Sequence, residues 1–170
     1  MKLFKTILIT GGAGFIGSHL VEELLSNENE ILIFDNCLTG KKENLEMTGN
    51  LKFTIDAFGS ENSLEEIEKF DPDVCFHLAA QSSVVVSVEN PALDFEHNIL
   101  QPIKLIQVLL KSNCKKLVFT SSGGTIFGEP SVIPTGEEDY ADEPESPYGV
   151  AKKRLNELIK IMTNNSNLKY

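Results

Sequence analysis

The chain has 170 residues, of which 41% are hydrophobic and 24% are charged, and its formal net charge is −10. This composition is typical of one globular domain with enough apolar side chains to fill a core. The acidic charge argues against nucleic-acid and anionic-membrane partners, because phosphate contacts require clustered lysine and arginine.

Short β-rich runs alternate with longer helical patterns along the chain. The runs are almost continuously hydrophobic, as parallel strands covered on both faces must be. The predicted strands span residues 4–10, 30–35, 51–56, 73–79 and 116–122, and the predicted helices span residues 15–26, 62–70, 91–112 and 147–164. This alternation predicts a doubly wound α/β fold with a parallel sheet and right-handed crossovers, forming one domain over residues 1–170.

The first predicted strand runs into a glycine-rich turn, "TGGAGFIG", that opens a helix. Gly11, Gly14 and Gly17 allow main-chain amides to approach a pyrophosphate at the positive end of that helix. The second strand ends in Asp35, at the spacing expected for a carboxylate that binds an adenosine ribose. This acid would repel a 2′-phosphate, so the pattern predicts NAD rather than NADP, with Asn36 able to add a hydrogen bond.

Residues at the ends of later strands are weaker candidates for the same site, because ligands of open α/β sheets lie beyond the carboxyl edge. Asp56 closes the third strand and is either an acceptor for the adenine amine or a helix cap. The fourth strand ends in the small residues "LAAQSS" at 78–83, where a dinucleotide can pass close to the backbone. We interpret His77, inside this apolar strand, as a core histidine.

The stretch "SPYGVAKKR" at 146–154 places Tyr148 and Lys152 four positions apart. Residues at this spacing share one face of a helix. An unperturbed tyrosine titrates near pH ~10, so its use as a base near neutrality requires lowering its pKa by about three units, roughly 4 kcal/mol. A fixed cation beside the phenol can supply much of that free energy by stabilising the phenolate.

Taken together, the motifs resemble the extended short-chain dehydrogenase/reductase family, and most closely its UDP-sugar 4-epimerase branch. The matching motifs occur in the family's order over the whole chain. They are "TGGAGFIG" at 10–17, "FDN" at 34–36, "HLAAQ" at 77–81, Asn98 in "HNI", "TSSGGTIFG" at 120–128 and "SPYGVAK" with Tyr148 and Lys152.

The resemblance implies a tightly held NAD and a UDP-linked sugar as substrate. Tyr148 would be the base, and Lys152 would bind the nicotinamide ribose and lower the Tyr148 pKa. The tyrosine would take a proton from a sugar hydroxyl while a hydride leaves the same carbon, and return of the hydride to the turned keto-sugar would give the epimer. The implied cofactor contacts are Gly11, Gly14, Phe15, Ile16, Gly17, Asp35, Asn36, Asp56, Ala57, Leu78, Ala79, Ala80, Gln81, Asn98, Ser121, Tyr148 and Lys152.

The active-site hydroxyl departs from the family pattern. Gly123 occupies the position where most members carry a serine or threonine, so Ser122 is the first candidate and Thr125 the second. Dehydratases of the family need an Asp and Glu pair where this chain has Gly124 and Thr125, which favours epimerisation. The alternative functions are a nucleotide-sugar dehydrogenase, reductase or dehydratase of the same family, or a non-catalytic NAD-binding module.

The family's proteins usually continue into a smaller domain that holds the nucleotide-sugar, so the chain is expected to be the cofactor half of a longer enzyme. "NLKY" at 167–170 resembles the approach to a sixth strand. The family's subunits pair through helices equivalent to 91–112 and 147–164, which implies a homodimer.

The chain has three widely spaced cysteines, Cys37, Cys75 and Cys114, with no zinc-type spacing. They are expected to be free thiols in a reducing cytoplasm, and no metal site is predicted. No apolar run approaches the roughly 20 residues of a membrane helix.

Overall fold

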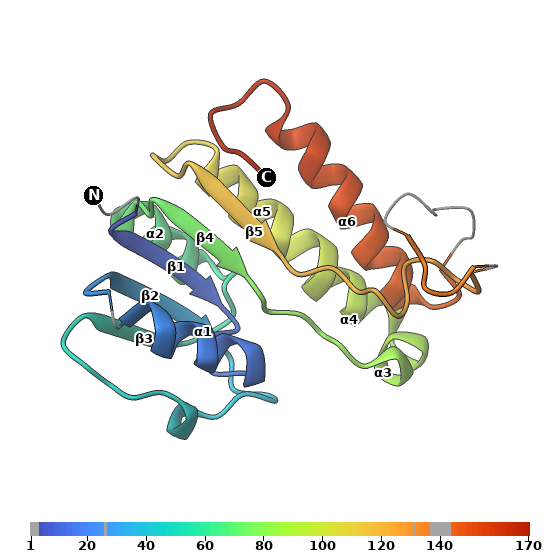
Figure 1. The fold of residues 1–170 in the computed structure, drawn as a ribbon, viewed down its shortest axis with the longest axis horizontal. Coiled ribbons are helices and arrows are strands. Elements are labelled where there is room, and N and C mark those ends of the chain that lie inside the picture. Colours follow the sequence, from blue (N-terminus) through green and yellow to red (C-terminus); the bar gives the residue numbers. More distant parts are fainter. Residues whose placement is uncertain (1–3, 26, 131, 137–143) are drawn as a thin grey trace.

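A parallel five-stranded sheet lies at the centre of the protein (Figure 1). The computed structural model describes residues 4–25, 27–130, 132–136 and 144–170. The strands run in the order β3-β2-β1-β4-β5. Their bounds are β1 Thr6–Thr10, β2 Glu30–Asp35, β3 Leu51–Ile55, β4 Val74–His77 and β5 Lys116–Phe119. The order reverses between β1 and β4, so the predicted doubly wound Rossmann fold is confirmed.

The strands end together at one edge of the sheet. Thr10 pairs with Phe34 of β2 and with His77 of β4. The fourth and fifth strands are shorter than predicted and stop at His77 and Phe119, because β1 turns away at the glycines and leaves the residues that follow without a neighbouring strand. The loops after these strands therefore diverge and open a crevice at the carboxyl edge.

Helices cover both faces of the sheet (Figure 1). On one face, α1 (Phe15–Leu25) packs through Val21 against the apolar side chains of β1 and β2. On the other face, α2 (Glu61–Phe70), α5 (Gln101–Leu109) and α6 (Pro147–Thr163) pack against the opposite side chains of the same strands. This two-sided burial explains why the strands are apolar along their whole length.

The segment predicted as one helix over residues 91–112 has three parts. These are α4 (Pro91–Phe95), a π-helical turn η2 (Glu96–Leu100) and α5. In η2 the Gln101 N–H donates to the Glu96 carbonyl, five residues back. Pro102 has no N–H to continue the regular ladder, which accounts for the wider turn at this point.

Two short elements were not predicted from the sequence. The 3-10 turn η1 (Lys42–Asn44) lies in the loop after β2, and the helix α3 (Val84–Glu89) follows β4. Three consecutive valines favour a strand at 84–86, but the Ser83 hydroxyl accepts a hydrogen bond from the Val86 N–H and starts a helix instead.

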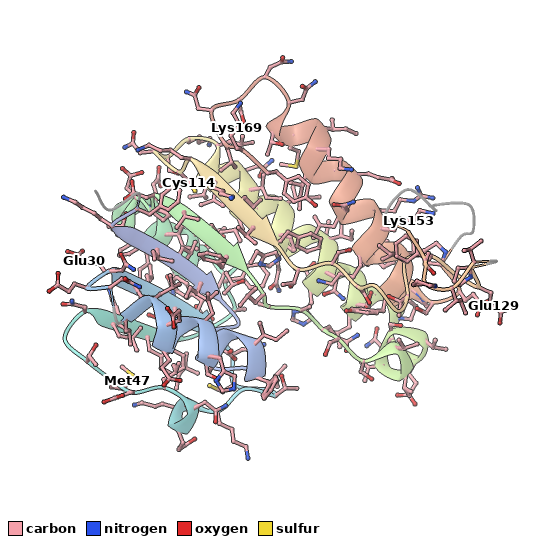
Figure 2. The ribbon with its side chains drawn as sticks, in the orientation of Figure 1. Glu30, Met47, Cys114, Glu129, Lys153 and Lys169 are labelled. Atoms are coloured by element: carbon pink, nitrogen blue, oxygen red, sulfur yellow. The ribbon has the colours of Figure 1, made fainter. Side chains whose placement is uncertain are left out.

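The end of the chain returns to the sheet beside β5. Lys169 pairs in parallel with Lys116, its N–H donates to the Lys115 carbonyl at 2.9 Å, and its carbonyl accepts from the Leu117 N–H at 2.8 Å. Figure 2 shows Lys169 close to Cys114, at the start of β5. Residues 167–170 therefore lie beside β5, where the sequence suggested the approach to a sixth strand.

No helix formed by the described residues is long and apolar enough to cross a bilayer. Cys37, Cys75 and Cys114 are free thiols.

Candidate cofactor-binding and active site

A cavity of about 640 Å³ lies at the carboxyl edge of the sheet. It extends from the glycine turn after β1 to the amino-terminal turn of α6. Every residue expected to contact the cofactor lines it except Asn98. Ser82 and Ser83 of "LAAQSS" line it too, and nine further lining residues were not expected from the sequence, which are Phe34, Leu38, Thr39, Phe58, Val86, Leu93, His97, Gln101 and Thr120.

Three of the four glycines of the turn have different structural roles. Gly11 adopts φ +75°, and a methyl group there would lie 2.7 Å from the Ala79 nitrogen. A methyl group on Gly17 would collide with the Gly11 carbonyl, so the first turn of α1 can pack on the loop only without a side chain. A methyl group on Gly14 would meet only the Gly11 oxygen, at 3.3 Å, and would otherwise point into free space. The fold therefore requires Gly11 and Gly17, whereas Gly14 keeps a cradle beside the cavity clear.

Asp35 joins two loops at the end of β2. Its side chain is 9% exposed; Oδ2 accepts a hydrogen bond from the Ala13 N–H at 3.0 Å, and Oδ1 accepts one from the Cys37 N–H at 2.8 Å. Cys37 adopts a left-handed conformation with φ +56°. Burial, with Asp35 as a second cause, raises the pKa of the Cys37 thiol. The carboxylate is thus fixed at the cavity wall with lone pairs left for a ribose.

Asp56 bonds to the turn that leads into α2. Its carboxylate accepts hydrogen bonds from the Ala57 N–H at 2.7 Å, the Ser60 hydroxyl at 2.5 Å and the Ser63 hydroxyl at 2.9 Å. These bonds, with Ser60 the largest contributor, lower the Asp56 pKa. The N-cap of α2 is Ser60 and not Asp56, and Asp56 lines the cavity, so its bond to the adenine amine stays a prediction.

Asn98 is 2% exposed and lies behind the cavity wall at Gln81, and its contact with the cofactor stays a prediction. Its Oδ1 accepts from the Gln81 N–H at 3.1 Å and its Nδ2 donates to the Gln81 carbonyl at 2.8 Å. The same Nδ2 donates to Asp94 Oδ1 at 2.9 Å, and that oxygen also accepts from Gln81 Nε2 at 2.7 Å. Asn98 and the fully buried Asp94 therefore hold the cavity loop at Gln81.

His77 is a core residue, as predicted. It is 2% exposed, and its Nδ1 lies 2.7 Å from the Thr10 hydroxyl. The ring packs against Phe58 and Phe119. Burial, with Lys152 as a second cause, lowers the His77 pKa to about 3, so the ring is neutral.

The first turn of α6 presents Tyr148 and Lys152 to the far end of the cavity. Ser146 caps this helix by accepting a hydrogen bond from the Gly149 N–H at 3.1 Å. The Lys152 side chain is 3% exposed; its ammonium donates to the Thr120 carbonyl at 2.8 Å and lies 4.5 Å from the centre of the Phe119 ring. Burial lowers the Lys152 pKa to about 8, and Asp94 partly opposes this.

Tyr148 is a protonated phenol in the chain by itself. Burial raises its pKa, a hydrogen bond with Ser122 acts in the opposite direction, and Asp94 adds to the rise. The expectation that Lys152 lowers the Tyr148 pKa is therefore not met by the chain alone, because the ammonium is directed at Thr120. A lowered pKa would require charge brought by a ligand.

Ser122 and Thr125, the two candidate hydroxyls, contact each other. The Thr125 hydroxyl donates to Ser122 Oγ at 2.7 Å, and Ser122 is the one of the two that contributes to the Tyr148 pKa. A methyl group on Gly149 would lie 2.6 Å from the Thr125 carbonyl, so this glycine lets the loop after β5 pack on α6. No group of three His, Cys, Asp or Glu side chains among the described residues can hold a metal ion.

Comparison with known proteins identifies the family. The sequence model of the NAD dependent epimerase/dehydratase family matches residues 7–170. The chain belongs to this family. It is 40% identical to UDP-glucose 4-epimerase from Thermotoga maritima, solved with UDP-glucose, with a TM-score of 0.90 over 97% of this chain and 53% of that one. It is 39% identical to the Thermus thermophilus UDP-glucose 4-epimerase, solved with NAD, with a TM-score of 0.87 over 96% of this chain and 52% of that one.

A curated relative shows the same partial coverage. The bifunctional UDP-glucose 4-epimerase and UDP-xylose 4-epimerase 1 of Pisum sativum is 38% identical over 92% of this chain and 47% of its own length. The chain thus spans about half the length of these relatives. Membership of the family and the NAD-bound relative confirm NAD as the predicted cofactor.

Proposed function

We propose that the chain is the cofactor-binding portion of an NAD-dependent epimerase that inverts C4 of a UDP-linked sugar. The observation that carries this proposal is that Tyr148 and Lys152 line one end of a cavity whose other end is the glycine turn, with Ser122 hydrogen-bonded to Tyr148. Two solved structures named UDP-glucose 4-epimerase have the same fold at 39–40% sequence identity. A curated sequence relative with 4-epimerase in its name is 38% identical.

The residues of the cavity fit NAD. The cradle beside Gly14 has room for a pyrophosphate at the amino end of α1, where the helix dipole favours negative charge. Asp35 has free lone pairs for the hydroxyls of the adenosine ribose, and its charge opposes a 2′-phosphate. When bound, NAD supplies hydride acceptance and donation.

The chain's own groups would handle the proton. Tyr148 Oη is held beside Ser122, so these two hydroxyls can both face one sugar oxygen, Tyr148 exchanging its proton and Ser122 keeping it oriented. Lys152 has two ammonium protons beyond the one donated to Thr120, and it can donate them to a ribose hydroxyl. A cation held there would also favour the Tyr148 phenolate.

We further propose that the protein is a homodimer paired through α4, η2 and α6. Leu100 on η2 and Ile161 on α6 are 49% and 72% exposed, which is unusual for large apolar side chains on helices that flank a core. Light scattering of wild type and of Ile161→Glu measures the assembly, and a wild-type monomer would refute it. The three free thiols support a reducing, cytoplasmic location.

The proposed function is tested in two steps. Calorimetric titration of the 170-residue chain with NAD and with NADP is expected to show saturable binding of NAD and much weaker binding of NADP. An enzyme that includes this chain is then assayed with UDP-galactose, and epimer formation without accumulation of NADH is expected. Net production of NADH would instead identify a dehydrogenase, and NAD binding without any turnover would identify a binding module.

A further inference from the structure

We propose that Gln101 is a specificity residue that accepts a hydrogen bond from the exocyclic amine of the adenine ring of NAD. The inference deepens the proposed function and rests on the same cavity. Nothing in the sequence motifs singles out this residue, because it lies three positions after Asn98 and outside every motif that resembles the family.

The main observation is a buried acceptor without a donor. Gln101 is the first residue of α5 and lines the cavity, yet its Oε1 is buried and has no hydrogen-bond partner among the described residues. Buried side-chain oxygens are nearly always bonded, so an orphaned one in the wall of a ligand cavity indicates a missing donor. A ligand that brings an N–H to this oxygen would satisfy it.

The position of Gln101 places this acceptor at the adenine end of the cavity. Its side chain packs against the loop after β3, since a methyl group on Gly59 would lie 2.6 Å from Gln101 Cβ and 2.7 Å from Cγ. A dinucleotide with its pyrophosphate at the glycine turn after β1 and its ribose at Asp35 after β2 extends its base toward β3. Gln101 therefore faces the base and not the nicotinamide.

The exocyclic amine has a hydrogen available for this acceptor. It is the only N–H donor group of the adenine ring in NAD, and it carries two hydrogens. Asp56, the other candidate, accepts three hydrogen bonds from Ala57, Ser60 and Ser63, of which its Oδ1 accepts one, so a carboxylate lone pair is left for one hydrogen of the amine. The unsatisfied Oε1 of Gln101 can accept the other.

The test compares NAD with deamino-NAD, in which a carbonyl replaces the amine. Calorimetry of the wild-type chain is expected to show NAD binding about 3- to 10-fold more tightly, the usual contribution of one such hydrogen bond. Gln101→Leu removes one acceptor of the amine and should lower the ratio, mainly by weakening NAD. Gln107→Leu, on the exposed side of the same helix, is the matched control and should keep the wild-type ratio.

The outcomes separate this inference from the proposed function. Equal binding of the two dinucleotides by the wild type would overturn the role of Gln101 and leave NAD binding intact, whether or not Gln101→Leu folds. A ratio in Gln101→Leu equal to that of the wild type would also overturn it. Binding of neither dinucleotide would refute the cofactor site itself, and the inference with it.

Discussion

The ammonium group of Lys152 donates a 2.8 Å hydrogen bond to the carbonyl oxygen of Thr120, the residue after β5. This contact ties α6 to the edge of the sheet and gives a nearly completely buried cation a hydrogen-bond partner. Burial raises the pKa of Tyr148, so the chain alone holds its proposed catalytic tyrosine protonated. We expect cofactor binding to redirect Lys152, because a ribose hydroxyl offers its other donors a partner.

Burial of Lys152 predicts a specific pH dependence of stability. Its pKa falls from 10.5 in the unfolded chain to about 8 in the folded one. Between these values the unfolded chain binds more protons, so this group makes the free energy of unfolding rise with pH. Below about pH 8 both states are protonated and the cost of burying the charge is fully present.

The matched variant for this effect is Lys152→Met, which keeps the approximate length of the side chain and removes its charge. Urea denaturation at pH 7 and pH 9.5 should show the stability of wild type rising relative to the variant by the order of 1–2 kcal/mol. A difference between the two proteins that stays constant with pH would contradict the lowered pKa.

Tyr148→Phe separates binding from chemistry. The substitution removes only the hydroxyl, so NAD affinity of the chain should be almost unchanged. In an enzyme that includes this chain, kcat should fall by about 10²- to 10⁴-fold, the usual contribution of a positioned acid–base group. Ordinary activity of this variant in an epimerase assay would refute the proton role of Tyr148.

Gly14→Ala and Gly17→Ala should affect different properties, NAD binding in the first and folding stability in the second. At Gly17 the added methyl collides with the loop, and the free energy of unfolding should fall by roughly 1–3 kcal/mol. At Gly14 the methyl meets only the Gly11 oxygen, at a tight 3.3 Å, so the free energy of unfolding should fall less than in Gly17→Ala while calorimetry shows weakened NAD binding. Unchanged NAD affinity in Gly14→Ala would mean that the cradle is not the pyrophosphate site.

Asp35→Asn tests the choice between NAD and NADP. The variant removes the charge and keeps the shape, so NAD should bind about 10- to 100-fold more weakly if the ribose hydroxyls bond to the carboxylate. The gap between NAD and NADP should narrow because the repulsion of a 2′-phosphate is gone. An unaltered preference, measured by parallel titrations, would assign the selectivity to another residue.

The sequence predicted the sheet and the cavity wall well, for a physical reason. Apolar runs mark buried parallel strands, and the residues that follow such strands must meet at one edge of the sheet. Gly11, Asp35 and Leu78 could therefore be assigned to one cavity without knowledge of the loops.

Features that depend on tertiary contacts were not predictable in this way. The Asn98 side chain bonds to the main chain of Gln81, 17 residues earlier in the sequence, and so holds in place a loop that lines the cavity. Asp94 lies four residues before it, at a spacing that indicates a shared helix face but not a buried partner. The Tyr148 pKa depends on burial and on where Lys152 points, and neither is encoded in their spacing.

The π-helical turn η2 allows one helical segment to satisfy two different surroundings. Each residue advances a regular α-helix by about 100°, so the extra residue in η2 rotates α5 relative to α4. Asp94 and Asn98 can then serve the polar loop while Leu105 and Leu109 fill the apolar core. Deletion of one residue within 96–100 would restore a regular helix and put these two sets out of phase, so insertions and deletions should be tolerated less here than substitutions.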